Sequence, residues 1–569
     1  MGWMRKKVLS LLVSRGVLIE PEALKLAIGT PDPDRLVESF LDSRGQKPLL
    51  VTADDLRCFM ESAVACQETP PVSTEGAAAS ARAPGQEKKQ ATLDPAGPEV
   101  REPPPKPPEA AAARRVAGGP GLPANADAKV AREAVEGSPE PPKPRRAGMG
   151  DRIAAKNYDA DIAVISEITD ESRCTGQASD FKNYFEDRLR SIRRILRQRP
   201  EMGGAVEVEK ALRVDRDVRL ICIVSDVARP QDKHSRGAWV TMEDETGSLK
   251  VWLPDDGGFA EKYVLKDEVI GIVGKVVRPK NQGYGRDRGP YIVAERLVRP
   301  ELAGPRTPRR SPNPLSIAFI SDIHVGSKQF LGDDWKRMMG WLKKGEGEAS
   351  RVKYVVVPGD LVDGIGVYPN QEEELDVDDI YLQYEALAKM LEEMPDHISL
   401  TLMPGNHDAS RLSEPQPALP CEVRKILGTR PLYVGNPCYL AIEGVRVLAY
   451  HGRGFDDYAG NLGPIGYQQP LMIMQEMLRR RHMSPIYGGK NQIAPERRDY
   501  LVINPIPDIF VTGHVHGAGI QEHNGIVIVN ASTWQSQTSF QRMHNFHPDP
   551  GKVPWVRLDS FMYGVENFH

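Results

Sequence analysis

Five short apolar segments in the second half of the chain are each followed closely by aspartate, asparagine or histidine. They run over residues 316–320, 354–357, 400–403, 445–450 and 509–512. Short apolar runs of this kind are typical of buried β-strands, so the polar side chains lie at the carboxyl ends of the strands. Open α/β sheets place their binding sites at those ends. The sequence therefore predicts one site to which all five strand ends contribute.

Seven side chains at these strand ends are candidate metal ligands. They are Asp322, His324, Asp360, Asn406, His451, His514 and His516. A pair of divalent ions needs a bridging carboxylate and several single ligands, which a set of this composition supplies. Imidazole ligands argue against magnesium and fit manganese, iron or zinc. A lone histidine is more often structural than a ligand, but coincidence is a poor explanation for seven such side chains at five consecutive strand ends.

Composition divides the remaining chain. Residues 67–150 hold 16 of the 48 prolines and contain no Phe, Trp, Tyr or Ile. Such a segment cannot bury enough apolar surface to offset its ordering entropy, so we expect a disordered linker.

Residues 1–66 have the apolar spacing of a small helical module, either a partner-docking element or a bare folding unit. Residues 151–212 are predicted to form a helical connector, because residues 181–195 keep the period of a basic amphipathic helix.

Residues 213–300 change to a strand pattern. About five β-segments in this range predict a small closed or half-closed barrel of the OB type. One loop of the barrel carries four cations around an aromatic residue: Arg278, Lys280, Arg286 and Arg288 surround Tyr284. Cations interleaved with an aromatic ring suit a single nucleic-acid strand, although a solvated loop would have the same composition.

Several classes of protein are excluded. The chain has no apolar run of about 18 residues, so we expect no membrane-spanning helix. The six cysteines are scattered and form no CxxC pair, which indicates reduced thiols in the cytoplasm and no cysteine-ligated zinc. The net charge of −4 does not indicate a general nucleic-acid binder, so any such binding must be local.

The motifs DIH, GDLVDG, GNHD, YHG and GHVH resemble, in this order, the motif series of the calcineurin-like metallophosphoesterases. This resemblance covers residues 315 to about 535 and implies a two-sheet αββα sandwich over residues 311–569. A barrel followed by such a domain resembles the small, B-type subunits of replicative DNA polymerases. Because the motifs are intact, the chain resembles in particular the small exonuclease subunit of archaeal family D DNA polymerase, which the stretches YPNQEEEL and NASTWQSQTSFQ also resemble.

The resemblance implies a role for each residue of the set. One ion would be bound by Asp322, His324, Asp360 and His516, and the second by Asp360, Asn406, His451 and His514. Asp360 would bridge the two ions, and a hydroxide between them would attack the phosphodiester in line. His407 would stabilise the transition state or protonate the departing oxygen, and Asp408 could orient His407.

The expected function is that of a metal-dependent 3′–5′ DNA exonuclease, the proofreading and scaffold subunit of a heterodimeric polymerase. The expected cofactors are two divalent ions, with manganese ahead of iron or zinc. The expected partners are a larger polymerising subunit and the 3′ end of a DNA primer. Two alternatives stay open: a catalytically silent structural B-subunit and a phosphatase of the same superfamily.

Overall fold

A computed structural model describes two groups of residues, and all structural statements below concern these residues. Most of the second part of the chain is included, namely residues 153–214, 217–228, 237–254, 264–278, 289–463 and 465–569. The first sixty positions contribute residues 8, 18–19, 21–28, 30, 33–43, 50–51, 56–57 and 59–60. The linker predicted over residues 67–150 lies outside the described residues.

The N-terminal unit contains two short helices, as the sequence predicts. They are α2 (Pro21–Ile28) and α3 (Pro33–Ser43), and the strands β1 (Leu18–Ile19) and β2 (Leu50–Val51) pair in parallel. Its small core consists of Val8, Ala23, Leu24, Ala27, Val37, Phe40, Leu41 and Leu56. The rest of the helical module proposed over residues 1–66 lies outside the described residues.

The predicted barrel is confirmed as a closed barrel of five strands in the order β4-β5-β6-β8-β7. The strands are β4 (Asp217–Ala228), β5 (Gly237–Asp244), β6 (Gly247–Pro254), β7 (Val269–Val277) and β8 (Tyr291–Val298). Alternate residues of β4, such as Leu220, Cys222 and Val224, belong to the barrel core, as the period of a strand requires, while Ile221 and Ile223 are buried on the other face of the strand. The short helix α7 (Val208–Ala211) adds apolar contacts to this core.

The C-terminal domain contains two mixed six-stranded sheets. The first has the order β12-β11-β10-β9-β18-β19 and the second the order β16-β17-β15-β14-β13-β3. The first consists of β9 (Ser316–Phe319), β10 (Val352–Pro358), β11 (Ser399–Met403), β12 (Leu432–Tyr433), β18 (Lys552–Arg557) and β19 (Tyr563–Asn567). The second consists of β3 (Ile162–Ser166), β13 (Cys438–Ile442), β14 (Val445–Ala449), β15 (Ile509–Thr512), β16 (Ala518–His523) and β17 (Ile526–Ala531).

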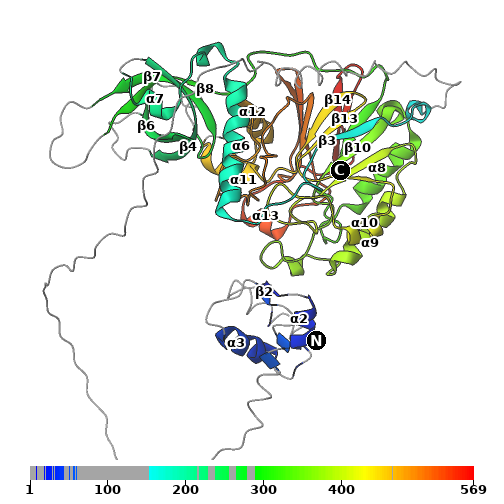
Figure 1. Ribbon diagram of the computed structural model, residues 1–569. Helices are drawn as coiled ribbons and strands as arrows, with labels where there is room; N and C mark the ends of the chain where they lie inside the picture. The colour runs from blue at the N-terminus through cyan, green and yellow to red at the C-terminus, as the bar shows by residue number, and fades with distance from the viewer. Residues whose placement is uncertain are drawn as a thin grey trace, which may run out of the picture. The chain divides into compact units, whose positions relative to one another are not determined.

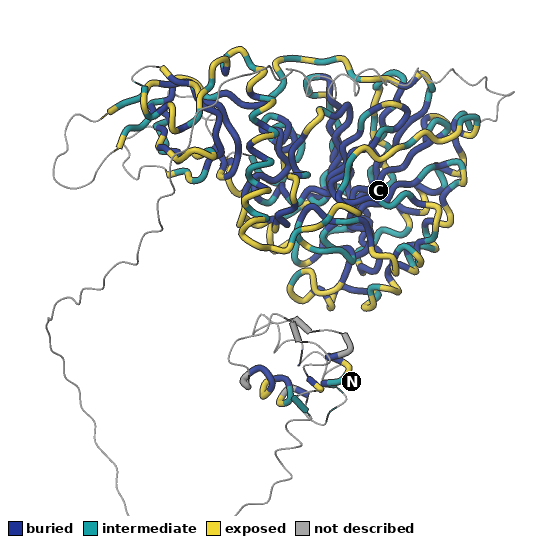
Figure 2. Tube along the Cα trace, viewed as in Figure 1, coloured by how far each residue is buried: buried dark blue, intermediate teal, exposed yellow. Residues whose placement is uncertain are grey.

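The two sheets pack face to face, with helices on both outer faces. Side chains of one parity along each strand, such as Ile317 and Val447, form the core between the sheets. Side chains of the other parity, such as Ala318 and Leu448, pack against helices. The helices are α8 (Gly332–Lys344), α9 (Ile380–Glu392) and α10 (Cys421–Leu427) on the first sheet, and α11 (Phe455–Asn461) and α12 (Pro470–Arg480) on the second. This is the expected αββα sandwich (Figures 1 and 2).

The connector before the barrel is partly different from the prediction. The amphipathic helix is present as α6 (Ala178–Leu196), and it lies between the barrel and the C-terminal domain (Figure 1). The same segment also contains β3, which pairs antiparallel with the edge of β13. Five further elements are short. One is the helix α13 (Ser539–Met543), and the others are the 3₁₀ turns η1 (Ala154–Asn157), η2 (Pro200–Met202), η3 (Gly347–Arg351) and η4 (Gln371–Glu373). None of the helices in the described part of the chain is long and apolar enough to cross a bilayer.

Candidate metal centre

All seven candidate ligands lie where the predicted strands end, and the structure brings them together. The strands β9, β10 and β11 run parallel in the first sheet, and β14 and β15 run parallel in the second. The loops after these five strands meet, so that the ligands form adjoining groups of acidic and imidazole side chains. The site therefore lies where the carboxyl ends of the two sheets come together.

Five of the seven candidate ligands have a left-handed backbone conformation. The φ angles are 51° at Asp322, 53° at His324, 51° at Asp360, 69° at His514 and 51° at His516. Such angles are uncommon for residues other than glycine and are concentrated at functional sites. Two neighbouring glycines are needed for space, because a Cβ atom at Gly405 or Gly513 would collide with a ligand carboxylate.

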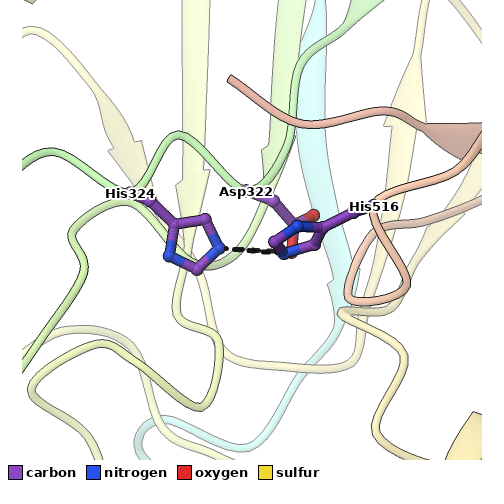
Figure 3. A group of neighbouring side chains, drawn as sticks. All are labelled: Asp322, His324 and His516. Atoms are coloured by element: carbon purple, nitrogen blue, oxygen red, sulfur yellow. Dashed lines mark hydrogen bonds and ion pairs between the residues drawn. The ribbon is translucent and has the colours of Figure 1, made fainter. Parts of the chain in front are cut away.

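The first group consists of Asp322, His324 and His516 (Figure 3). The Nε2 atoms of the two histidines face one another at 3.0 Å. Asp322 Oδ1 lies 3.5 Å from His516 Nε2 and 4.0 Å from His324 Nε2. All three side chains are buried. The three ligand atoms thus converge on one point, as ligands of a single ion would.

The second group is built on Asp360 and His451, with His514 and Asn406 beside them. His451 Nε2 lies 3.3 Å from Asp360 Oδ2 and 3.0 Å from Asn406 Oδ1. Asp360 Oδ2 also lies 3.9 Å from His324 Nε2 of the first group. Because one carboxylate oxygen faces both groups, Asp360 has the position that a bridging ligand needs.

The hydrogen bonds behind the histidines show that the donor set fits a metal. His324 Nδ1 contacts Asp363 Oδ1 at 3.0 Å, and His451 Nδ1 contacts the carbonyl oxygen of Pro358 at 2.9 Å. A carbonyl only accepts, so the His451 Nδ1 atom carries a proton, and Nε2 is the ring nitrogen that faces Asp360. His514 Nε2 contacts Asp456 Oδ2 at 3.4 Å, which leaves Nδ1 for an ion. Such outer contacts orient metal-ligating histidines in proteins.

Burial and mutual attraction set the charges of the centre. Burial lowers the pKa of His516 well below its usual value, so this ring is neutral. Burial also tends to raise the pKa of Asp360, but His451 and His407 outweigh it and hold the pKa well below the ordinary value. Asp360 in turn raises the pKa of His451 to about 9 against the effect of burial. The centre therefore presents ionised Asp360 beside imidazoles, and a cation bound there would displace a proton from His451.

His407 and its neighbour Asp408 have different hydrogen-bond partners. The ring of His407 lines the cavity over the centre, with its Nε2 3.9 Å from Asp360 Oδ2. Its Nδ1 contacts the carbonyl oxygen of Asp363 at 2.7 Å. Asp408 accepts instead from the backbone of Gly405 and Leu361 and from the Tyr384 hydroxyl. The residue that orients the ring is thus Asp363, whereas the contacts of Asp408 hold the loop that carries the ligands.

A cavity of about 570 Å³ opens over the centre. Its lining includes two basic side chains and several rings that sequence reasoning did not select: Arg453, Lys490, Tyr368, Tyr467, Phe540, His544 and Phe546. Asp363, Asp456 and Gln541, which contact the ring nitrogens of ligands, were also missed. Only Asp363 and Arg453 gave a sequence signal, because they lie within three residues of a ligand in the GDLVDG and YHGRG segments.

The basic loop of the barrel is mostly outside the described residues, which include Arg278 but not Lys280, Tyr284, Arg286 or Arg288. Arg278 is exposed, and its guanidinium donates to the carbonyl oxygen of Leu212 at 2.6 Å. DNA contact by this loop stays a prediction.

The structure thus defines a barrel-containing protein with a candidate metal centre at the junction of two packed sheets. Residues 317–518 match the family model that describes the B subunit of DNA polymerases alpha and epsilon. The DNA polymerase II small subunit of Archaeoglobus fulgidus is 41% identical over 404 residues, which cover 70% of this chain and 78% of that protein. The small subunit of Halobacterium salinarum is 30% identical over 570 residues and covers 99% of this chain and 98% of its own length.

The chain belongs to the family of archaeal DNA polymerase II (family D) small subunits. A third relative, the small subunit of Methanocaldococcus jannaschii, is 39% identical over 417 residues, or 71% of this chain and 68% of that protein. Among solved structures, an archaeal phosphodiesterase aligns with 44% of this chain and 99% of its own, at 12% identity and a TM-score of 0.25.

Proposed function

We propose that this chain is a two-metal-dependent 3′–5′ DNA exonuclease that serves as the proofreading subunit of an archaeal DNA polymerase. The observation that carries the proposal is the pair of adjoining ligand groups that share Asp360. The ligands proposed for one ion are Asp322, His324, Asp360 and His516, and those for the other are Asp360, Asn406, His451 and His514. Carboxylates mixed with imidazoles favour manganese, with iron or zinc as the other candidates.

Two divalent ions in this centre would polarise the phosphodiester and supply a nucleophile at neutral pH. The protein's own contribution is to position the reacting groups. His407 reaches the cavity from the loop after β11, and its ring is fixed through Nδ1. Burial lowers the pKa of His407, and the negative charge of an incoming phosphodiester opposes this effect by favouring the protonated ring. A proton on Nε2 would then be available to the departing oxygen.

Membership of the family supports the proposed partners. Relatives are named as small subunits, so we propose a larger polymerising subunit as the partner of this chain. The 3′ end of a primer is the proposed substrate. The proposed domains keep the boundaries expected from sequence, with a helical module over 1–66, a linker over 67–150, a connector over 151–212, the barrel over 213–300 and the nuclease domain over 311–569.

Digestion of end-labelled DNA tests the proposed activity. The purified full chain, with and without a co-expressed large subunit, is incubated with manganese and a 5′-labelled oligonucleotide. We expect a ladder that shortens from the 3′ end and stops on chelation. Asp360→Asn should abolish the ladder, because a neutral amide is a poor bridge between two cations.

The matched control is Asp396→Asn, since Asp396 is fully exposed and remote from the ligands. This control should leave the ladder unchanged. No digestion by either form of the wild-type chain would favour a silent structural B-subunit. Turnover of p-nitrophenyl phosphate above that of DNA would favour a phosphatase.

A further inference from the structure

The metal centre is flanked by two hollows that meet at the candidate ligands. The larger is the 570 Å³ cavity, and the smaller has a volume of about 350 Å³. Four residues line both: Val367, Asn406, His407 and Arg453. A polymer cut at the centre needs room on each side of the bond that breaks. The arrangement of the hollows supplies that room.

Arg453 lies at the boundary between the hollows, two residues after the candidate ligand His451. Its Nε atom is buried and has no hydrogen-bond partner. Its guanidinium forms no hydrogen bond or ion pair with any of the residues that the structure describes. A buried donor without a partner is destabilising, so a ligand that accepts from it would be stabilised. Guanidinium groups match the geometry of phosphate oxygens.

Aromatic rings line the larger hollow. Tyr368 and Phe540 lie with their ring centroids 5.2 Å apart and their planes 32° apart, and both rings are partly exposed. Tyr467 and Phe546 form a second pair at 6.1 Å, and Lys490 Nζ lies 5.9 Å from the Tyr467 ring. Rings combined with cations bind single strands by stacking on bases and attracting phosphates. Among the described residues, the lining of the smaller hollow contains no ring except that of His407 and combines aliphatic side chains, such as Ile365 and Leu412, with polar ones.

We propose that Arg453 binds the phosphate backbone of the DNA strand at the point where it crosses the centre, while the base of the terminal nucleotide stacks on the Tyr368–Phe540 pair. The preceding nucleotide lies in the smaller hollow. A base is available for such stacking only when it is unpaired. This inference rests on the proposed nuclease function, since it assigns the substrate contacts of the same site.

Binding of a strand that resists hydrolysis tests the inference separately from turnover. The probe is a single strand with 2-aminopurine as its 3′-terminal base and a phosphorothioate at the last linkage, mixed with the full chain in manganese. The fluorescence of 2-aminopurine falls when the base stacks. We expect Phe540→Leu to remove most of this decrease and to weaken binding roughly 5- to 100-fold, and Phe540→Trp to retain both.

Arg453→Gln should weaken binding of the same strand roughly 10- to 100-fold and raise KM more than it lowers kcat. Metal content and the terminal stacking signal at saturation should be unchanged. Arg453→Lys should restore only part of the affinity, because an ammonium lacks the planar fork. Arg190→Gln, at an exposed position of α6, is the matched control and should bind as the wild type does.

Two results would overturn the inference. Unchanged affinity in Arg453→Gln would show that this side chain does not contact the strand, and loss of metal from that variant would make it a support of the centre. A wild-type chain that binds and stacks the probe but never cleaves DNA would contradict the proposed function and leave the substrate contacts standing.

Discussion

Each candidate histidine ligand has one ring nitrogen that faces the other ligands. The other ring nitrogen contacts a protein group, and this group differs from one histidine to the next. Asp363 holds His324 and also contacts Gln371 and Gln535, so its carboxylate is fixed from three sides. We predict that Asp363→Asn lowers the affinity for manganese by about 10- to 100-fold, the usual effect of losing such an outer contact. Calorimetric titration of the metal-free chain measures it. Asp396→Asn is the control, and equal affinity in both variants would show that Asp363 has no part in ion binding.

The position of His407 separates catalysis from metal binding. Its ring lines the cavity with Nε2 3.9 Å from Asp360 Oδ2, its Nδ1 contacts the carbonyl oxygen of Asp363, and we propose it as the group that protonates the departing oxygen. We therefore predict that His407→Ala retains both ions and DNA affinity, while turnover falls by about 10²- to 10⁴-fold.

His451→Ala provides the comparison, because it should lose an ion and recover in part with excess manganese. The metal content and the turnover rate of both purified variants distinguish a metal ligand from a catalytic acid. A metal-depleted His407→Ala that recovers with manganese would make His407 a ligand.

Glu496 connects the segment before α6 to the C-terminal domain. It accepts from the backbone of Arg173 at 2.7 Å, from Ser172 Oγ at 2.6 Å and from Arg411 at 2.9 Å. Burial tends to raise the pKa of Glu496, but these donors outweigh it and lower the pKa to about 2. A lowered folded-state pKa stabilises the protein above the unfolded pKa of about 4.3, and this stabilisation is lost as pH falls toward about 2.

We predict that Glu496→Gln lowers the free energy of unfolding by about 1.5–3 kcal/mol near pH 7. The difference from wild type should shrink as pH falls below about 4. Urea titrations at several pH values measure it, with exposed Glu522→Gln as the control. A difference that stays constant down to pH 3 would contradict the assigned pKa.

At the scale of single residues, the sequence predicted those ligands that directly follow a strand. The contact residues were missed because they come from loops and from short helices that have no apolar periodicity. Gln541 and Phe540, for example, belong to α13, far along the chain from any ligand-bearing strand. Only the folded arrangement of the two sheets brings such residues to the cavity.

Helix α6 joins the barrel to the C-terminal domain through a buried arginine. Arg188 donates to Asp499 at 2.7 Å and to the carbonyl oxygen of Asp267, which lies beside the barrel strand β7. His482 also contacts Asp499, and burial together with Arg188 lowers the pKa of His482 to about 4. The basic amphipathic helix expected from the sequence therefore contains one cation that is fully buried.

We predict that Arg188→Ala lowers the free energy of unfolding by about 3–5 kcal/mol, because it leaves Asp499 buried without its partner. Denaturant unfolding measures the change. Arg190→Ala, two residues along the same helix and exposed, should change stability by less than about 0.5 kcal/mol. Equal stability of the two variants would show that α6 is held by its apolar contacts alone.

Elements whose apolar pattern is long or strongly periodic were predictable. The strand pattern expected over residues 213–300 forms the barrel strands β4 to β8, and the amphipathic period expected over residues 181–195 is that of α6. β3 was not predicted, because its five residues are mostly exposed and its strand conformation depends on pairing with β13. Tertiary pairing of that kind has no local signal in the sequence.

At the scale of the whole C-terminal part, the order of the motifs along the chain could be predicted, but not their division between two sheets. Three ligand-bearing strands belong to the first sheet and two to the second. Asp360 in the first sheet and His451 in the second approach within 3.3 Å, so the centre depends on how the two sheets pack together. Damage to that packing should therefore disturb ion binding before it disturbs either sheet.

Metal content is the most direct test of the central claim that this junction holds a pair of ions. The wild-type chain and Asp360→Asn are saturated with manganese, dialysed and measured by mass spectrometry of the elements. We predict about two ions per wild-type chain and fewer than one in the variant, since both groups share the lost charge. A single ion in the wild type, or an unchanged content in Asp360→Asn, would contradict the shared centre.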